Sequence, residues 1–172
     1  MKKTTDSKKL TISGMFLALA LVMPFLTGQI PQFGSMLCPM HFPILLCGYF
    51  CGGMTGLLVG LIAPLLRSAL FGMPPLFPVA VCMSVELAVY GLAAGGIYRI
   101  LPHKKWAVYA SCISAMILGR IAWGAAMVVC IGAENFGMEA FLAGAVTTAL
   151  PGIVLQLILI PMLVITLNKQ QN

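Results

Sequence analysis

Residues 38–60 read CPMHFPILLCGYFCGGMTGLLVG, a segment without a single Asp, Glu, Lys or Arg. Glycine recurs in it at Gly48, Gly52, Gly56 and Gly60, every fourth position. Small residues at this spacing share one face of a helix and let neighbouring helix backbones approach closely, as they do in membrane bundles. The segment therefore predicts apolar helices that pack tightly against one another in a lipid bilayer.

The composition of the whole chain agrees with this segment. Of the 172 residues, 60% are apolar and only 8% are charged, and the mean hydropathy is +1.03. Because soluble domains carry roughly 25% charged residues, this composition excludes a soluble globular protein. The length suits one transmembrane domain, residues 1–172. The sequence has no GxxxxGK[ST] phosphate-binding loop, so we expect any ATP hydrolysis to belong to partner subunits.

Proline, glycine and polar residues divide the chain into apolar segments, which we compare with the about 20 residues that a helix needs to span the hydrocarbon core. The second segment is too short to cross upright, so we expect it to be tilted, partly re-entrant or extended by residues 34–37. We expect helices throughout, because isolated strands leave backbone groups unpaired in lipid. The predicted fold is an all-α integral membrane protein, a bundle of six transmembrane helices at residues 10–27, 38–50, 54–71, 77–101, 106–131 and 138–168.

Basic residues predict the orientation of this bundle. Four lysines lie within residues 2–9, His103, Lys104 and Lys105 separate the fourth and fifth segments, and Lys169 follows the sixth. With six spans, all of these residues lie on one side, which the positive-inside rule makes cytoplasmic. Both termini are therefore expected in the cytoplasm. This distribution accounts for the net charge of +6 without nucleic acid as a partner.

The cysteines and histidines predict neither a disulfide framework nor a metal site. The six cysteines lie singly in apolar runs without a CxxC pair, as small hydrophobic residues do. Only two histidines are available as imidazole ligands, and one of them adjoins two lysines. We also find no paired Asp residues or HxxxH motif of the kind that a membrane enzyme would use. The chain is therefore expected to be neither an enzyme nor a cofactor protein.

Three ionisable residues are predicted at membrane depth, where a charge costs about 2.5–3.5 kcal/mol on insertion scales. Glu86 lies roughly 13 Å from the outer end of its segment and Arg120 roughly 16 Å from the outer end of the next. Their similar depths allow either a structural ion pair or joint contact with a polar ligand. Arg67 lies near the outer end of the third segment. It either extends to the surface or offers a planar group to a carboxylate or phosphate.

Other candidate site residues are polar or aromatic. His41, at the outer end of the second segment, and Gln156, at mid-depth in the last, each suit either a ligand or a bond within the bundle. Tyr90 and Trp123 each lie about one helical turn after a buried charge, so they predict either aromatic pocket walls or core packing. Polar residues, among them Asn135, collect in the outer connectors, where we expect the ligand to bind.

Three segments resemble the substrate-binding S components of energy-coupling factor (ECF) vitamin transporters: CPMHFPILLCGYFCGG at 38–53, GLIAPLLRSALFGMPPLFP at 60–78 and ELAVYG at 86–91. The resemblance is greatest to the branch with folate, pantothenate and pyridoxine-type members. It extends over essentially the whole chain in length and in six-helix layout.

This resemblance implies a vitamin-binding subunit in the bacterial plasma membrane. It implies that the vitamin binds at the outward end, and that the chain topples to deliver it through a membrane scaffold subunit and two cytoplasmic ATPases. The first helix of such proteins commonly presents an AxxxA surface to the scaffold. This chain has GMFLA at 14–18 instead, so Gly14 and Ala18 are the residues expected at that interface.

Pantothenate is the vitamin that we predict. Arg67 and Arg120 suit an anionic ligand, and His41 and Glu86 suit its hydroxyl groups. This argument weakens if Glu86 and Arg120 neutralise each other.

The alternative vitamins are a pyridoxine-like or hydroxymethylpyrimidine ring, stacked on Tyr90 or Trp123, and folate or a queuosine precursor. An alternative of another class is a self-sufficient proton-coupled carrier with Glu86 as its protonation site. Such carriers usually have more helices and an internal repeat.

Overall fold

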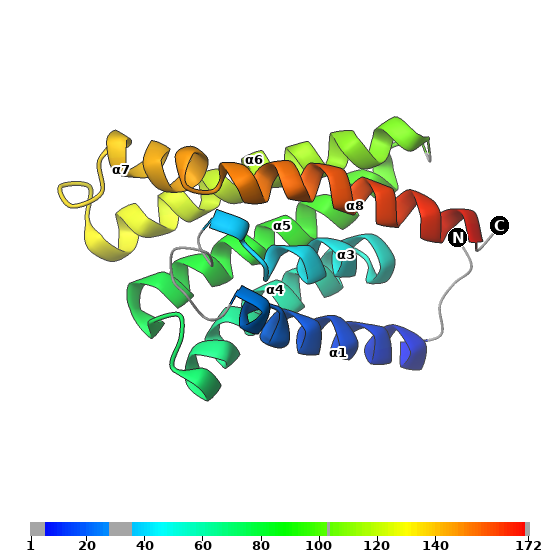
Figure 1. The fold of residues 1–172 in the computed structure, drawn as a ribbon, viewed down its shortest axis with the longest axis horizontal. Helices are drawn as coiled ribbons and strands as arrows, with labels where there is room; N and C mark the ends of the chain where they lie inside the picture. The colour runs from blue at the N-terminus through cyan, green and yellow to red at the C-terminus, as the bar shows by residue number, and fades with distance from the viewer. Residues whose placement is uncertain (1–5, 28–35, 103, 171–172) are drawn as a thin grey trace.

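The computed structural model describes residues 6–27, 36–102 and 104–170 of the chain, and every regular element in these ranges is helical (Figure 1). Lys2, Lys3, His103 and residues 28–35 of the predicted outer connector at 28–36 lie outside the described residues. In chain order the elements are α1 (Asp6–Val22), η1 (Met23–Thr27), α3 (His41–Cys51), α4 (Gly53–Phe71), η2 (Leu76–Ala80), α5 (Val81–Ile100), α6 (Lys105–Ile131), α7 (Met138–Leu142), η3 (Ala143–Thr147) and α8 (Leu150–Gln170).

The membrane character of the predicted fold is confirmed, and the count of six spans is not. Five helical stretches in the described residues are long and apolar enough to cross a bilayer: Asp6–Leu26, Gly53–Phe71, Leu76–Ile100, Lys105–Ile131 and Leu150–Leu167. The second predicted segment forms α3, which is only 11 residues long. At 1.5 Å per residue it reaches roughly 16 Å, about half the hydrocarbon core.

The sixth predicted segment, residues 138–168, is interrupted rather than continuous. It contains α7, the wider turns of η3, a turn at residues 148–149 and then α8. Pro151 explains the interruption, because its ring has no N–H to donate and would clash with the carbonyl four residues earlier in a continuous helix. It is tolerated in the first turn of α8, where a free N–H is not needed.

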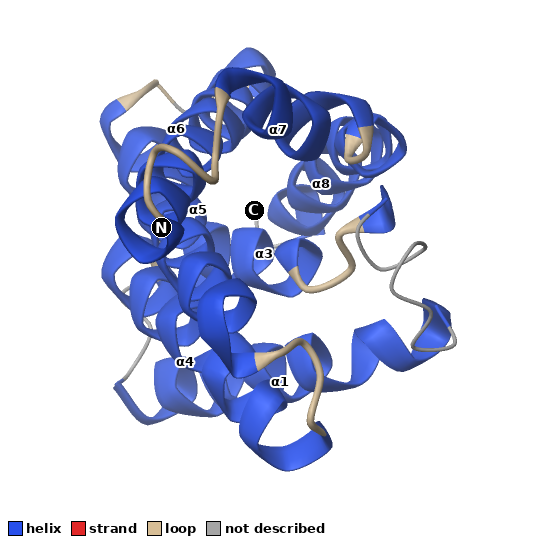
Figure 2. Ribbon diagram, turned by 90° about the vertical axis from the view of Figure 1, so that its left-hand side faces the viewer, coloured by secondary structure: helices blue, strands red, loops and turns tan. Residues whose placement is uncertain are grey.

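The helices form an elongated bundle around the short helix α3. Viewed along the bundle, α3 lies near the centre with α1, α4, α5 and α8 around it, and all four pack against it (Figure 2). The start of α1, the end of α8 and the connection between α5 and α6 lie at one end (Figure 1). The connection between α6 and α7 lies at the other. We call these the basic end and the outer end.

Glycine brings α3, α4 and α5 into backbone contact, as the four-residue spacing predicts. A Cβ added to Gly91 of α5 would collide with the backbone of Gly56 of α4, and one added to Gly48 of α3 would meet the carbonyl of Gly91. A Cβ on Gly60 would likewise collide with Leu87. No side chain separates the three helices at these points, so their relative positions are tightly fixed.

Gly52 alone links α3 to α4, and it reverses the direction of the chain. Its φ of 96° and ψ of 159° lie in a region that side-chain-bearing residues rarely adopt. Because this reversal is so tight, α3 lies directly against α4, and the N-terminus of α3 is held against α5 in the outer half of the bundle.

Candidate ligand-binding site

A buried ion pair joins α5 to α6 in the outer half of the bundle. Oε1 of Glu86 lies 3.0 Å from Nη1 of Arg120, and their side chains are only 2% and 14% exposed. Packing places these residues at the same depth, as the sequence predicts. A carboxylate and a guanidinium so close together compensate each other's charge where a single charge would be costly.

His41 is the third member of this cluster. It is the first residue of α3, and its Nε2 lies 3.2 Å from the same Oε1 of Glu86. The backbone N–H of His41 donates to the carbonyl of Cys38, which closes the turn that begins the helix. His41, Glu86 and Arg120 therefore come from three helices and meet at one carboxylate oxygen.

Cys38 also contacts the cluster, although it was not predicted as a site residue. Nη2 of Arg120 lies 3.5 Å from Sγ of Cys38 and donates to it. Cys38 has a φ of 48°, unusual for a residue with a side chain. Burial raises the pKa of this thiol, which lies outside the candidate spans, and the nearby Arg120 charge opposes that effect. The thiol is therefore neutral, and Glu86 supplies the negative charge of the cluster.

Tyr90 forms one wall of the cluster, one helical turn after Glu86. Its ring meets the His41 ring edge to face, with centroids 4.9 Å apart. It also lies against the backbone of Gly119, where a Cβ would collide with the ring. Gly119 is thus a second residue that sequence reasoning missed, because its role depends on a side chain from another helix.

Several buried polar atoms of the cluster and of Gln156 on α8 have no hydrogen-bond partner within the described part of the chain. They are Nδ1 of His41, the hydroxyl of Tyr90, Nε of Arg120, and both the amide nitrogen and oxygen of Gln156. Buried polar groups are nearly always paired, so a concentration of such atoms requires an explanation. A small molecule with hydroxyl, amide or ring-nitrogen groups would supply both donors and acceptors to them.

The position of Gln156 on α8 indicates which part of the bundle its side chain faces. Its side chain is 1% exposed. It follows Gly152 by one helical turn, and the backbone of Gly152 packs directly against Met36 and Leu37, just before Cys38. Gln156 is therefore on the face of α8 that is turned toward the start of α3.

Arg67 is held apart from the cluster. Its Nη1 donates to the carbonyl of Leu21, and its guanidinium lies over the rings of Phe25 and Phe71, at 4.9 Å and 5.4 Å from their centroids. The residue is only 3% exposed, so the predicted extension of this side chain to the surface is wrong. The aromatic rings and the carbonyl stabilise the cation in place of water.

Trp123 and Asn135 lie nearer the outer end and do not contact the cluster in the described structure. Trp123 packs against Phe136 and Phe141, with centroids 5.4 Å and 6.2 Å away. Asn135 is exposed, and its side-chain amide donates to the carbonyl of Ile131 at the end of α6. Trp123 is therefore part of an aromatic group between the cluster and the outer end, and Asn135 caps the C-terminal end of α6.

The described residues contain no group of three or more His, Cys, Asp and Glu side chains that could hold a metal ion. What the cluster offers is a set of hydrogen-bonding groups in an apolar surrounding, with no net fixed charge from its ion pair. Small-molecule sites commonly have this character. Fold and site together define a membrane-embedded protein suited to bind a small polar solute.

Comparison with known families identifies the class more closely. The chain matches the family model described as ECF transporter, substrate-specific component, over residues 8–164, and it belongs to this family. Members are the substrate-binding subunits of transporters, and membership implies a small-molecule substrate, a membrane scaffold subunit and ATPase partners. The resemblance to ECF S components is thereby confirmed, and the branch within that family stays a prediction. Comparisons with curated proteins and with solved structures gave no match.

Proposed function

We propose that this chain binds a vitamin at the outer end of the bundle and delivers it into bacteria through an ECF scaffold and two ATPases. Lys104 and Lys105, together with Lys8 and Lys9 near the start of α1 and Lys169 near the end of α8, support a cytoplasmic location of the basic end. The site then faces the outside of the plasma membrane, where the vitamin is captured.

We further propose pantothenate as the vitamin. The observation that carries this proposal is the set of unpartnered atoms on His41, Tyr90, Arg120 and Gln156. Because Glu86 and Arg120 neutralise each other, these atoms favour an uncharged, hydroxyl-rich group. The pantoyl end of pantothenate has two hydroxyls and an amide, and methyl groups that suit the aromatic wall.

Arg67 is the proposed partner of the carboxylate at the other end of this ligand. Gly60 of α4 packs on Leu87 of α5, the residue after Glu86. Arg67 follows Gly60 by seven residues, so it lies roughly 10 Å nearer the outer end. An extended pantothenate has a comparable length. Its pantoyl end at the cluster would therefore leave its carboxylate at the level of Arg67.

A pyridoxine-like or hydroxymethylpyrimidine ring is the second candidate. It is supported by the Tyr90 ring, which meets the His41 ring edge to face and places aromatic surface beside Glu86. In this alternative the ring nitrogen or hydroxyl bonds to Glu86, and Arg67 has no part in binding. Affinity for ligands without a carboxylate distinguishes the two candidates.

Gly14 and Ala18 are the proposed scaffold contact. Both are exposed on α1, and a Cβ added to Gly14 meets nothing within 4 Å in this chain. Ala20, by contrast, is fully buried within the bundle. Gly14 and Ala18 thus form a smooth strip on an outward face, which a partner helix can approach closely.

Two measurements test this function. Mass spectrometry of small molecules released from the purified protein, followed by thermal-shift screening of a vitamin panel, identifies the ligand, because binding to the folded state raises its apparent stability. Pantothenate is the expected ligand. Stabilisation by a neutral ring compound, and not by pantothenate, would overturn the proposal of pantothenate. In liposomes, binding without uptake is expected from the isolated chain, whereas uptake without ATP or partners would identify a self-sufficient carrier.

A further inference from the structure

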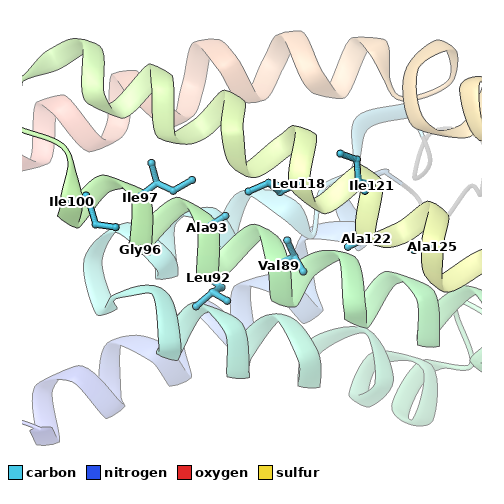
Figure 3. Close-up of a pocket in the computed structure, with 10 residues that line it drawn as sticks. All are labelled: Val89, Leu92, Ala93, Gly96, Ile97, Ile100, Leu118, Ile121, Ala122 and Ala125. Carbon is cyan, nitrogen blue, oxygen red and sulfur yellow. The ribbon is translucent and has the colours of Figure 1, made fainter.

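An apolar groove lies on the surface of the bundle between α5 and α6 (Figure 3). The groove has a volume of about 470 Å³. Its floor includes the small residues Ala93, Gly96, Ala122 and Ala125, and larger aliphatic side chains form its sides. None of its lining residues is charged or has a polar side chain, unlike the cluster around Glu86.

The groove opens toward the surrounding membrane. Among its lining residues, Ile100 is 86% exposed and Ile121 is 58% exposed. A Cβ added to Gly96 meets nothing within 4 Å, so no other part of the described chain covers the floor at this point. An apolar chain can therefore lie in the groove against both helices.

The dimensions of the groove match one leaflet of a bilayer. On α5 it extends from Val89 to Ile100, roughly 16 Å at 1.5 Å per residue. Half of a hydrocarbon core about 30 Å thick is close to this length. An acyl chain that starts at Ile100, the lining residue nearest the basic end, would reach the bilayer midplane along the groove.

Positive charge lies at the same end of the groove. Lys104 and Lys105 follow Ile100 closely in the connection to α6, and both are exposed. Neither forms an ion pair with a described residue. Trp106 is next in sequence and half exposed, as aromatic residues at a membrane interface commonly are.

We propose that this groove binds one molecule of an anionic phospholipid, with an acyl chain between α5 and α6 and the phosphate between Lys104 and Lys105. The aliphatic lining accounts for the chain, and the two lysines favour an anionic headgroup over a zwitterionic one, as basic sites on the cytoplasmic side of membrane helices do. The proposal is independent of the ligand at the Glu86 cluster.

The test measures lipid retention by native mass spectrometry of the full chain, purified from nanodiscs that contain equal amounts of phosphatidylglycerol and phosphatidylcholine. The wild type is expected to retain phosphatidylglycerol preferentially. Lys104→Gln with Lys105→Gln should reduce that preference about tenfold or more, because each lysine near the headgroups contributes to anionic lipid binding. Gly96→Leu should reduce retention of both lipids by filling the groove.

Two control variants make the test specific. Lys8→Gln with Lys9→Gln removes the same charge from α1, and Ala69→Leu adds the same side chain to an exposed position on α4; both should retain lipid as the wild type does. Thermal unfolding in detergent verifies that each variant is folded. Equal retention of the two lipids by the wild type, or unchanged retention by the Lys104/Lys105 and Gly96 variants, would overturn the proposal. The proposal would also be overturned if Gly96→Leu retained lipid as the wild type does but no longer bound the scaffold, since a partner helix would then occupy the groove.

Discussion

Glu86 of α5 and Arg120 of α6 form an ion pair, 3.0 Å between Oε1 and Nη1, through the carboxylate oxygen that also contacts His41. This pair holds two helices together at a depth where each charge alone would be unfavourable. In the proposed binding mode, the surrounding polar atoms are left to interact with a part of the ligand that carries no charge. The structural and binding roles of these residues can be separated by experiment.

Replacing Glu86 and Arg120 by glutamine, singly and together, should separate those roles. Glu86→Gln or Arg120→Gln alone leaves one buried charge without its partner and should lower the free energy of unfolding by about 3 kcal/mol. The double variant has no uncompensated charge and should recover most of that stability, but not vitamin affinity. Denaturation and isothermal titration of all four proteins measure the two effects. Recovery of affinity in the double variant would show that the pair is only structural.

The hydroxyl of Tyr90 should contribute to binding and not to folding. Tyr90→Phe removes a group without a partner in the described structure, so unfolding should change little, while affinity for the vitamin falls about tenfold with the loss of one hydrogen bond. Tyr49→Phe is the matched control, because the Tyr49 hydroxyl donates to the carbonyl of Val108 within the core. That variant should lose stability and keep its affinity. The opposite result for Tyr90 would remove its hydroxyl from the site.

Arg67 should favour pantothenate, which has a carboxylate, over pantothenol, the neutral analogue with an alcohol in its place. Arg67→Gln should weaken pantothenate binding by about tenfold or more, the value of a charge-assisted hydrogen bond, and leave pantothenol binding nearly unchanged. Titration of both ligands against both proteins gives the comparison. Equal weakening for the two ligands would indicate that Arg67 acts through the packing of α1 against α4, where it bonds to Leu21.

Glycine at the contact of α3, α4 and α5 should be indispensable. Gly91→Ala places a Cβ against the backbone of Gly56 and should destabilise the protein by at least about 1–3 kcal/mol, because helix backbones cannot relax as side chains do. Gly96→Ala on the same helix meets no atom and serves as the control. Thermal unfolding of the two variants should differ clearly, and similar midpoints would show that the helices can separate at low cost.

The exposed strip on α1 should matter only in the assembled transporter. Gly14→Leu adds a side chain to an open surface, so ligand binding and thermal stability of the isolated chain should be unchanged, while co-purification with the scaffold declines. Ala69→Leu on the exposed side of α4 is the matched control. Normal assembly of the Gly14 variant would place the scaffold contact elsewhere.

Much of the fold and part of the site could be predicted because lipid restricts the alternatives. Glu86 and Arg120 were recognisable as partners since charged residues within apolar segments are rare and their depths follow from helix geometry. The glycine spacing predicted close packing for a similar reason, as small residues on one helical face have few other uses in a bilayer.

The remaining features depend on contacts between distant segments. The position of Cys38 beside Arg120, and the Tyr90 ring against Gly119, arise from how α3 and α6 meet α5, which periodicity does not encode. For Arg67 the sequence left two roles open, extension to the surface or contact with an anionic ligand. Its bond to Leu21 required knowledge of which helix packs against α4. The break before Pro151 was not predicted, because the apolar run continues on both sides of it.

The backbone contact among α3, α4 and α5 also limits how ligand preference can evolve in this chain. Because Gly48, Gly56 and Gly91 admit no larger residue, mutation cannot widen the site by moving these three helices apart without loss of folding. If the proposed site is correct, new specificity must instead be acquired by replacing side chains at positions such as Gln156 and Tyr90. A directed-evolution library for another vitamin should therefore keep the glycines constant and vary the residues that face the ligand.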